Sequence, residues 1–410
     1  MNAICTIVAK NYFAYAATLM NSIKETNPDV EYYVLIADDI AENFDNRDIN
    51  IINIRELEFS NLNELRYKYD VTEFCTAVKP RLLLYLFQKY HYDKVMYLDP
   101  DIWVFDKLDF IWDILDNHSL VVTPHIIQAE EQRELFHIQS EESILMSGIF
   151  NLGFVAFANT DEAMRIIKWW DKRLLVACYD DMNCGIFTDQ KWMNFCLAFA
   201  ESAYVLRHPG VNVAWWNYHE KEILIRNNKP IVLYQEKEYS MVFFHFSGYS
   251  PKNENEIGRH SIDISAQQEK EIKKIYKMYN ELLMANGYET YSTSSYPYMY
   301  YDNGITITRL QRRMYRRLLE KGKSWDNPFS TKKGSYYELL KKNGLIVKEY
   351  NNNFNQNNKK TEKNMKYEKW LQVAFRMLKR IIGIKNYSYL IRYLNHCATD
   401  ENQIFLLTKK

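Results

Sequence analysis

The sequence predicts an α/β protein built on a mostly parallel sheet. Its first half alternates short apolar runs with helical patterns, which is typical of strand–helix–strand crossover units. Acidic residues follow two of the strand-like runs, at Asp38 and Asp99, where ligands bind in such sheets. The 410 residues, 47% of them hydrophobic, are enough for a large core and favour two or three structural units.

The expected elements follow one another regularly along the first half. Strands are expected at 4–9, 32–37, 51–54, 95–98 and 120–123, and helices at 15–24 and 81–90. Pro80 suits the first turn of the second helix. The stretch Asn159-Thr160-Asp161-Glu162 is expected to cap a further helix, whose buried side would carry Met164, Ile167, Trp170 and Leu174. The acids that follow Thr160 suit a helix N-terminus, so we assign them no chemistry.

The composition changes after about residue 255. Helices are expected at 269–285 and 309–321, and residues 292–303 between them are rich in Tyr, Ser and Pro. We therefore expect a mostly helical extension over 256–350, which is a candidate region for an acceptor. Residues 351–360 are Asn-rich and are interpreted as a disordered linker. The last segment, 361–410, is expected to be a basic amphipathic helical tail.

This tail has two faces and a strong local charge. Residues 359–385 contain nine Lys or Arg against two Glu, a local net charge of +7. A helical wheel of 370–384 separates an apolar face from Arg376, Lys379 and Arg380. The apolar face is formed by Trp370, Leu371, Ala374, Phe375, Met377, Leu378, Ile381 and Ile382. Such a helix can lie on an anionic membrane through 361–385, or dock its apolar face on the first domain or on a partner subunit.

The whole chain has no charge bias. It contains 52 basic and 52 acidic residues, so nothing in its balance favours nucleic acid as a partner. The six cysteines form no C-x-x-C pair, which indicates reduced thiols. The N-terminus lacks the pattern of a signal peptide, and no apolar run is long enough to cross a bilayer. We expect a cytoplasmic protein, peripheral on the inner face of the membrane if the tail binds lipid.

The sharpest candidate for chemistry is Asp99-Pro100-Asp101, which lies between the apolar runs 95–98 and 102–105. Two carboxylates one residue apart at a strand end can hold a hard divalent cation, Mn²⁺ or Mg²⁺. Such a cation usually shares its ligands with substrate phosphates and neutralises a leaving diphosphate. The alternative is an ordinary solvated loop, since Asp-x-Asp is common by chance.

Other candidates are weaker alone. His245 lies in an aromatic run, where packing in the core is the simpler explanation. Gly248 would allow a phosphate to approach the backbone, and Lys252 could reach one. Asn151, and the pair Asp189 and Gln190, suit either a binding site or a turn, and Asp189 also suits a helix cap.

Taken in order, these motifs resemble those of the family 8 glycosyltransferases, which have the GT-A fold. The family's first strand ends in an Ala-Asp-x-Asn-Tyr-like turn, and this chain has Ala9-Lys10-Asn11-Tyr12. A basic helix with Lys79 and Arg81 precedes Tyr97-Leu98-Asp99-Pro100-Asp101, as in the family. Asn151-Leu152-Gly153, Asp189-Gln190 and the segment from His245 to Lys252 match later motifs in order. The resemblance covers residues 1 to about 255.

The resemblance implies a GT-A catalytic domain over 1–255, with a Rossmann-like, mixed and mostly parallel sheet flanked by helices. It implies a nucleotide-diphosphate sugar as donor and Mn²⁺ or Mg²⁺ held by Asp99, Asp101 and His245. Further donor-binding residues would be Ala9, Asn11, Tyr12, Asp38, Lys79, Arg81, Asp99, Gly248 and Lys252. Asn151, Asp189 and Gln190 would line the transferred sugar.

The expected function is therefore metal-dependent transfer of a sugar to a glycan or lipid-linked acceptor in cell-surface polysaccharide synthesis. Family members retain the anomeric configuration, so no dedicated base is expected; an inverting reaction would need one, with Asp189 the first candidate. One alternative is a sugar-1-phosphate nucleotidyltransferase, although residues 9–12 lack the glycines that cradle a triphosphate. Another is a non-catalytic glycan-binding protein that uses its many aromatic side chains.

Overall fold

The computed structural model describes residues 1–40, 44, 46–129, 141–227, 229–252, 257, 264–347 and 362–407, and only the backbone of 183 and 362–368. These residues fall into two compact units. The first unit comprises Met1–Ser60 and Val71–Tyr296, and the second comprises Asn61–Asp70 and Pro297–Lys410. The boundaries expected at 255, 350 and 360 remain predictions, and the expected linker at 351–360 lies outside the described residues.

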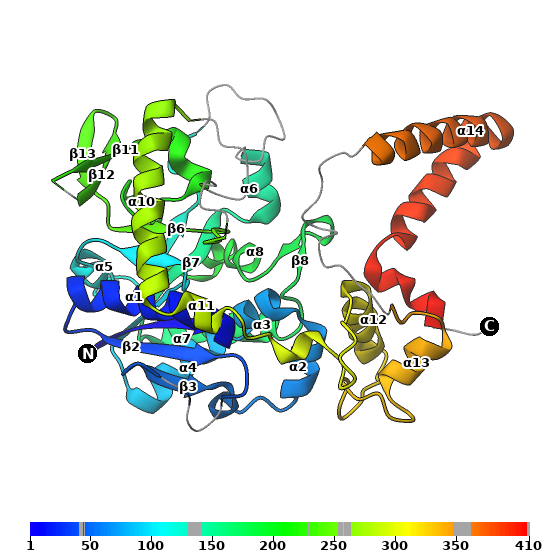
Figure 1. Cartoon of the computed structure of the whole chain (residues 1–410), viewed down its shortest axis with the longest axis horizontal. Helices are drawn as coiled ribbons and strands as arrows, with labels where there is room; N and C mark the ends of the chain where they lie inside the picture. The colour runs from blue at the N-terminus through cyan, green and yellow to red at the C-terminus, as the bar shows by residue number, and fades with distance from the viewer. Residues whose placement is uncertain are drawn as a thin grey trace. The chain divides into compact units, whose positions relative to one another are not determined.

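A seven-stranded mixed sheet forms the centre of the first unit (Figure 1). Its strands in spatial order are β10 (Ala203–Val205), β6 (Leu120–Pro124), β7 (Phe150–Ala158), β4 (Lys94–Leu98), β1 (Asn2–Val8), β2 (Glu31–Ile36) and β3 (Asn50–Asn53). Neighbouring strands are parallel except at β7, which is antiparallel to both β4 and β6. The expected mixed, mostly parallel sheet flanked by helices is confirmed.

Smaller strands and helices complete the first unit. The remaining strands are β5 (Ile102–Val104), β8 (Asp180–Asp181), β9 (Ile186–Phe187), β11 (Glu222–Arg226), β12 (Lys229–Tyr234), β13 (Lys237–Ser240) and β14 (Phe243–His245). The helices are α1 (Phe13–Thr26), α3 (Val71–Ala77), α4 (Lys79–Tyr90), α5 (Asp109–Ile114), α6 (Glu141–Ser147), α7 (Asp161–Leu174), α8 (Gln190–Met193), α9 (Cys196–Phe199), α10 (Ala266–Ala285) and α11 (Tyr288–Tyr291). Short 3₁₀ helices include η1 (Lys10–Tyr12) and η4 (Trp215–Glu220).

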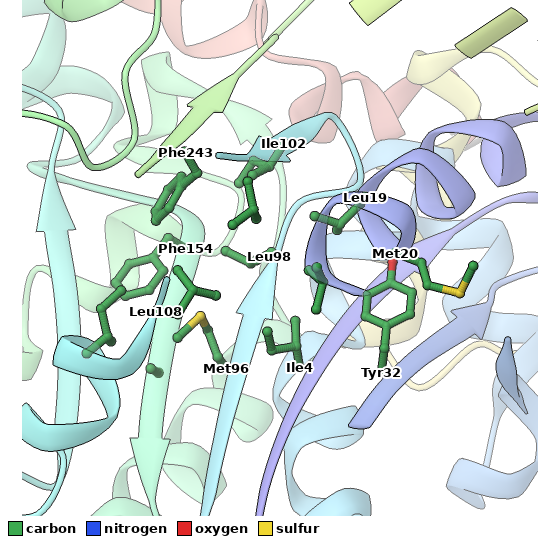
Figure 2. Packing of buried hydrophobic residues seen from close by; sticks show 14 of the residues in the cluster. Ile4, Leu19, Met20, Tyr32, Met96, Leu98, Ile102, Leu108, Phe154 and Phe243 are labelled. Atoms are coloured by element: carbon green, nitrogen blue, oxygen red, sulfur yellow. The ribbon is translucent and has the colours of Figure 1, made fainter. Parts of the chain in front are cut away.

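Side chains alternate between the two faces of the sheet, as strand geometry requires. Ile4, Met96, Leu98 and Phe154 share one face and pack with side chains of α1, such as Leu19 (Figure 2). The ring of Phe157, on the opposite face of β7, contacts Trp170 of α7. Thr160, within the expected cap at 159–162, caps α7, and the buried side of this helix includes Ile167, Trp170 and Leu174, with Met164 only partly buried.

The second unit has its own aromatic core. It contains α2 (Leu62–Lys68), α12 (Arg309–Glu320), α13 (Tyr336–Lys342), α14 (Glu362–Cys397) and the 3₁₀ helix η7 (Asp400–Leu407). The buried hydroxyls of Tyr67 and Tyr301 lie 2.6 Å apart, within a cluster that includes Tyr315 and Tyr336. Tyr301, from the Tyr-rich stretch considered for an acceptor, thus packs in a core. The expected helical C-terminal region is confirmed.

The expected tail helix at 370–384 forms, but it breaks at its penultimate residue. Gly383 has a φ of +74°, so α14 consists of two helical stretches joined there. Glycine adopts this left-handed conformation without a steric penalty. The side chains of Trp370, Met377 and Ile381, which belong to the expected apolar face, are exposed to solvent.

Candidate active site

Strand pairing brings the two ends of the candidate metal site together. Asp99 follows β4 and Asp101 directly precedes β5, which pairs antiparallel with β14. In this pair His245 lies opposite Ile102, and the backbone N–H of Phe246 donates to the carbonyl of Asp101 at 2.8 Å. The pairing therefore fixes the distance between segments that are far apart in the sequence.

Asp99, Asp101 and His245 form a compact cluster of metal-ligating atoms. His245 Nε2 lies 3.2 Å from Asp101 Oδ1 and 3.8 Å from Asp99 Oδ2, and one ligand atom from each residue lies within 4.8 Å of the others. Two carboxylates and one imidazole suit Mn²⁺ well and Mg²⁺ acceptably. The chemistry of these donors thus fits the expected cation.

Asn212 sets the orientation of the His245 ring. His245 Nδ1 lies 3.2 Å from Asn212 Oδ1, while the amide nitrogen of Asn212 donates to Asn151 Oδ1 at 3.1 Å. The Asn212 oxygen must therefore accept a hydrogen bond from the Nδ1–H, which directs Nε2 toward the carboxylates. Burial lowers the pKa of His245, but the carboxylates of Asp101 and Asp99 outweigh burial and raise it. A cation that binds at Nε2 would have to displace the proton on that nitrogen.

The Asn151 side chain forms hydrogen bonds with other residues of the protein. Its Oδ1 accepts from the N–H of Gly153 at 3.1 Å as well as from Asn212, and its amide nitrogen faces His125 Nε2 at 3.3 Å. Burial lowers the pKa of His125 to about 4, so this imidazole is neutral and can accept from Asn151. The Asn151 side chain therefore connects Gly153, Asn212 and His125, and its amide is not free to bind a ligand.

Asp189 and Lys79 form a buried ion pair beside the cluster. Lys79 Nζ lies 2.6 Å from Asp189 Oδ2 and donates to the carbonyl of Leu152 at 2.7 Å. It also lies 4.0 Å from Asp99 Oδ1, which accepts from the Tyr97 hydroxyl at 2.8 Å. Burial raises the pKa of Asp189, and the Lys79 ammonium opposes this effect. Asp189 is the N-cap residue of α8, as the helix-cap interpretation placed it, but its side chain makes no capping hydrogen bond and pairs with Lys79 instead.

The segment predicted to bind the nucleotide forms a turn after β1, and a hydrogen bond ties this turn to Asp38 after β2. The backbone N–H of Lys10 donates to buried Asp38 at 3.0 Å, and the N–H of Tyr12 to the carbonyl of Ala9 at 2.9 Å. The Tyr12 ring, 42% exposed, stacks on Tyr15 with centroids 4.6 Å apart. The side-chain oxygen of Asn11 is buried and has no hydrogen-bond partner among the described residues. This turn thus offers a polar atom and a ring to a ligand.

Two other predicted residues, Arg81 and Gln190, make their contacts outside the cluster. The Arg81 guanidinium pairs with Asp171, with Nη2 2.7 Å from Oδ2. The Gln190 amide donates to the carbonyl of Ser147 at 3.0 Å. Lys252 is exposed, in the loop after β14. Gly248, in the turn before it, has a φ of +76°, which explains a glycine there.

Several residues of the site had no clear signal in the sequence. Asn212 and His125 lie outside the recognised motifs, and nothing in their surroundings marks them. Tyr97 belongs to the recognised motif, but its hydrogen bond to Asp99 was not predicted. The ring of Trp216 stands perpendicular to His245, with centroids 5.1 Å apart, and contacts His125 similarly.

Residues 3–167 match the model of the family described as glycosyl transferase family 8. Two Bacillus subtilis (strain 168) proteins are similar to this chain, and both are described as uncharacterized. YfnF is 24% identical over 69% of this chain and 91% of its own, and YfnD is 22% identical over 62% and 79%.

Solved structures of glycosyltransferases are also similar. The galactosyltransferase LgtC is 17% identical, covers 67% of this chain and 95% of its own, and has a TM-score of 0.42. The glycosyltransferase GlyE of Streptococcus pneumoniae TIGR4 is 14% identical, with coverages of 72% and 65% and a TM-score of 0.41.

Proposed function

We propose that the chain is a family 8-like glycosyltransferase that moves a sugar from a nucleotide-diphosphate donor to a glycan or lipid-linked acceptor in cell-surface polysaccharide synthesis. The observation that carries this proposal is the meeting of Asp99, Asp101 and His245 in one cluster. Two of these residues lie within the range that matches the family, and the third reaches them through the pairing of β5 and β14.

In this proposal Asp99, Asp101 and His245 hold Mn²⁺ or Mg²⁺. The bound cation supplies Lewis acidity that neutralises charge on the leaving diphosphate. The chain's own residues keep the ligands in place: Tyr97 and Lys79 hold Asp99, and Asn212 orients His245. Gly153 leaves the space that the His245 ring occupies, since a Cβ there would lie 2.5 Å from Cε1 of that ring.

The donor's base would lie at the turn formed by Ala9, Asn11, Tyr12 and Asp38. The buried oxygen of Asn11 is an acceptor that a base N–H can satisfy, and the exposed ring of Tyr12 offers a stacking surface. Gly248 and Lys252 lie on the loop after His245, from which they can approach the diphosphate. Arg81 is a weaker candidate because Asp171 already pairs its guanidinium.

We expect retention of anomeric configuration. An inverting reaction needs a carboxylate base near the acceptor hydroxyl. Asp189, the candidate for that role, is committed to Lys79 in a buried ion pair. With retention the departing phosphate accepts the acceptor's proton. Proton NMR of the first product formed checks this, and a product of opposite configuration to the donor would contradict it.

A thermal-shift screen of nucleotide sugars with and without Mn²⁺ tests the donor and the metal together. A true donor should stabilise the chain markedly more with Mn²⁺ than without, since a ligand that binds only the native state raises its stability. Asp101→Ala should abolish both the metal-dependent shift and transfer while leaving the fold intact. Asp113→Ala, an exposed acid on α5, is the matched control and should change neither. Full activity in EDTA would rule out the metal mechanism.

We further propose that α14 binds the anionic inner face of a membrane, which would place this cytoplasmic enzyme beside a lipid-linked acceptor. Residues 369–397 carry six Lys or Arg and no Asp or Glu. Trp370, Met377 and Ile381 are exposed on the same helix. Apolar side chains with flanking positive charge are typical of helices that lie in a membrane interface. Among the described residues, no helix has the length and apolarity needed to cross a bilayer.

The membrane proposal is tested on the full chain, because removing the tail would also remove Glu401, which pairs with buried Arg313. Changing Arg376, Lys379 and Arg380 together to Gln should lower the affinity for phosphatidylglycerol vesicles by roughly 100-fold, at about 1 kcal/mol per charge. Co-sedimentation with the vesicles measures this affinity. The control changes Lys341 and Lys342 of α13 to Gln and should have little effect. Equal sedimentation of all three proteins would favour docking of α14 on protein.

A further inference from the structure

His125 lies at the far end of a series of buried hydrogen bonds that begins at the candidate metal ligand His245. His245 Nδ1 lies 3.2 Å from Asn212 Oδ1, and the Asn212 amide nitrogen lies 3.1 Å from Asn151 Oδ1. The Asn151 amide nitrogen lies 3.3 Å from His125 Nε2. His125 Nδ1 in turn lies 3.1 Å from the carbonyl oxygen of Ile149. None of the four side chains is more than 8% exposed, so each bond forms away from bulk water.

Two backbone groups fix the direction of these hydrogen bonds. The N–H of Gly153 can only donate, and it meets Asn151 Oδ1 at 3.1 Å, so the Asn151 amide nitrogen must face His125. The carbonyl of Ile149 can only accept, so His125 carries its proton on Nδ1 and presents a bare Nε2 to Asn151. The two assignments start from different backbone groups, and they agree where Asn151 meets His125.

The same direction extends to the metal ligand. Because Asn151 Oδ1 takes an N–H of the Asn212 amide, the Asn212 oxygen faces His245 and accepts the Nδ1–H. The backbone of Asn212 has a φ of +52°, in the left-handed region that asparagine tolerates better than most residues. His245 thus keeps a proton on Nδ1, and Nε2 is the nitrogen that can lose its proton and bind a cation.

One indole and one amide hold both imidazoles in place. The Trp216 ring stands at 89° to His245 and at 72° to His125, with centroids 5.1 and 5.4 Å away. The amide nitrogen of Asn217 donates to the backbone carbonyls of His125 and Asn212 at 3.1 and 3.0 Å. The two ends of the series are therefore fixed relative to each other, and His125 is connected to His245 by contiguous contacts.

We propose that His125 is a positioning residue that fixes, through Asn151 and Asn212, the form of His245 that can bind a divalent cation at Nε2. His125 supplies an acceptor for the Asn151 amide nitrogen. Without it that buried amide would carry an unpaired N–H, which favours turning the amide over. A turned Asn151 would oppose the N–H of Asn212, and a turned Asn212 would present N–H groups to His245 Nδ1 and favour a proton on Nε2. This inference rests on the metal site of the proposed function.

Two substitutions at His125 separate the positioning role from a merely structural one. The side-chain amide of glutamine reaches the place of Nε2, so His125→Gln can still accept from Asn151. The amide of asparagine reaches only the place of Nδ1, so His125→Asn keeps the contact with Ile149 and leaves the Asn151 amide unpaired. Each variant loses one buried hydrogen bond, so both should lower the melting temperature of the metal-free full chain by similar amounts.

We expect only His125→Asn to weaken metal binding. Its Mn²⁺ affinity should fall roughly 10-fold, the low end of the range for outer-shell hydrogen bonds, while His125→Gln should stay within about threefold of wild type. Electron paramagnetic resonance of free Mn²⁺, with and without a nucleoside diphosphate, measures the affinity.

His118→Asn is the matched control, at the opposite end of β6 from His125. His118 Nδ1 also faces a backbone carbonyl, that of Ile114 at 2.9 Å, but the residue lies outside the series. Its replacement should leave Mn²⁺ affinity within about twofold of wild type.

Nitrogen-15 NMR of the histidine-labelled full chain tests the direction of the series without any substitution. In the metal-free protein His125 should carry a proton on Nδ1 and none on Nε2. A proton on Nε2 instead would donate to Asn151 and reverse the direction, which would overturn the proposal whether or not the variants fold.

The outcomes separate the positioning role from the metal site itself. If the wild-type chain binds Mn²⁺ and His125→Asn binds it equally tightly, the positioning role is wrong and the metal site stands. Equal losses of Mn²⁺ affinity in His125→Asn and His125→Gln would show that His125 only supports the fold, and would also overturn the role. If the wild-type chain binds no Mn²⁺ in either condition, the metal site and the positioning role both fail.

Discussion

Gly153 is the residue at which the site has least room. A Cβ there would lie 2.5 Å from His245 Cε1, 2.8 Å from Asn151 Oδ1 and 2.9 Å from Asp99 Oδ2. All three distances are shorter than van der Waals contact allows. Only glycine therefore fits at this position of β7 without displacing its neighbours.

Gly153→Ala should displace the His245 ring. We expect at least a tenfold loss of Mn²⁺ affinity and a loss of about 1–3 kcal/mol in the free energy of unfolding, because overpacking a filled core shifts its neighbours. Calorimetric Mn²⁺ titration and urea unfolding measure the two effects. Val155→Ala, two residues along the same buried strand, is the control: it should lower stability but preserve Mn²⁺ binding. Wild-type Mn²⁺ affinity in Gly153→Ala would show that His245 is not a ligand.

The site depends on the pairing of β5 with β14. The sequence could predict the two runs of residues, but not that they pair. The apolar run 102–105 and the aromatic run 243–246 were evident; Asp101 directly precedes the first and His245 lies within the second. No local pattern states which strands pair across so long a separation; the family resemblance supplied that link. Asn212 escaped prediction for a related reason, since it lies outside any strand or helix, where no periodicity applies.

The start of α7 shows an acid whose role is structural. Glu162 accepts hydrogen bonds from the backbone N–H groups of Glu201 and Ser202 and from the Ser202 hydroxyl. Partial burial alone would raise the pKa of Glu162, but these hydrogen bonds lower it to about 2. The helix-dipole interpretation from sequence was therefore incomplete: the carboxylate also fastens the loop that leads into β10.

Glu162→Gln should reduce the free energy of unfolding by about 1–2 kcal/mol at pH 7, a value discounted for the part of the carboxylate in contact with solvent. A lowered folded-state pKa contributes stability above the unfolded-state value, which is lost as the pH falls from about 4.5 to about 2. Urea unfolding between pH 7 and 3 should show a weaker acid dependence in the variant. Asp161→Asn, exposed in the same turn, is the control; identical acid dependence in wild type and Glu162→Gln would contradict this account.

At the scale of the whole molecule, one short segment departs from the sequence-based view. Residues 61–70 lie within the part expected to be a single catalytic domain, yet they belong to the second unit. Buried Arg312 donates to the carbonyls of Arg66, Tyr67 and Tyr69 at 2.6–3.1 Å, where α2 ends. Local patterns predicted helices in the C-terminal region, but not a cap made by an arginine from so distant a part of the chain.

Arg312→Met should destabilise the second unit by about 3 kcal/mol or more, because it leaves several buried carbonyls without a donor. Differential scanning calorimetry and limited proteolysis should show earlier unfolding of 61–70 and 297–407, with the transition of the first unit unchanged. Arg309→Met, which breaks a half-exposed pair with Asp400, should cost no more than about 1 kcal/mol. A single transition lowered equally throughout would contradict independent units.

The place of residues 61–70 also has a consequence for how the chain is made. Roughly 230 residues are synthesised between this segment and Pro297, where the rest of its unit begins. At about 5–20 residues per second, α2 leaves the ribosome some 10–45 s before its partners exist. During that time Tyr67 and Tyr69, both 0% exposed in the finished protein, have no core to enter. A nascent chain stalled before residue 297 should therefore bind holdase chaperones through this segment.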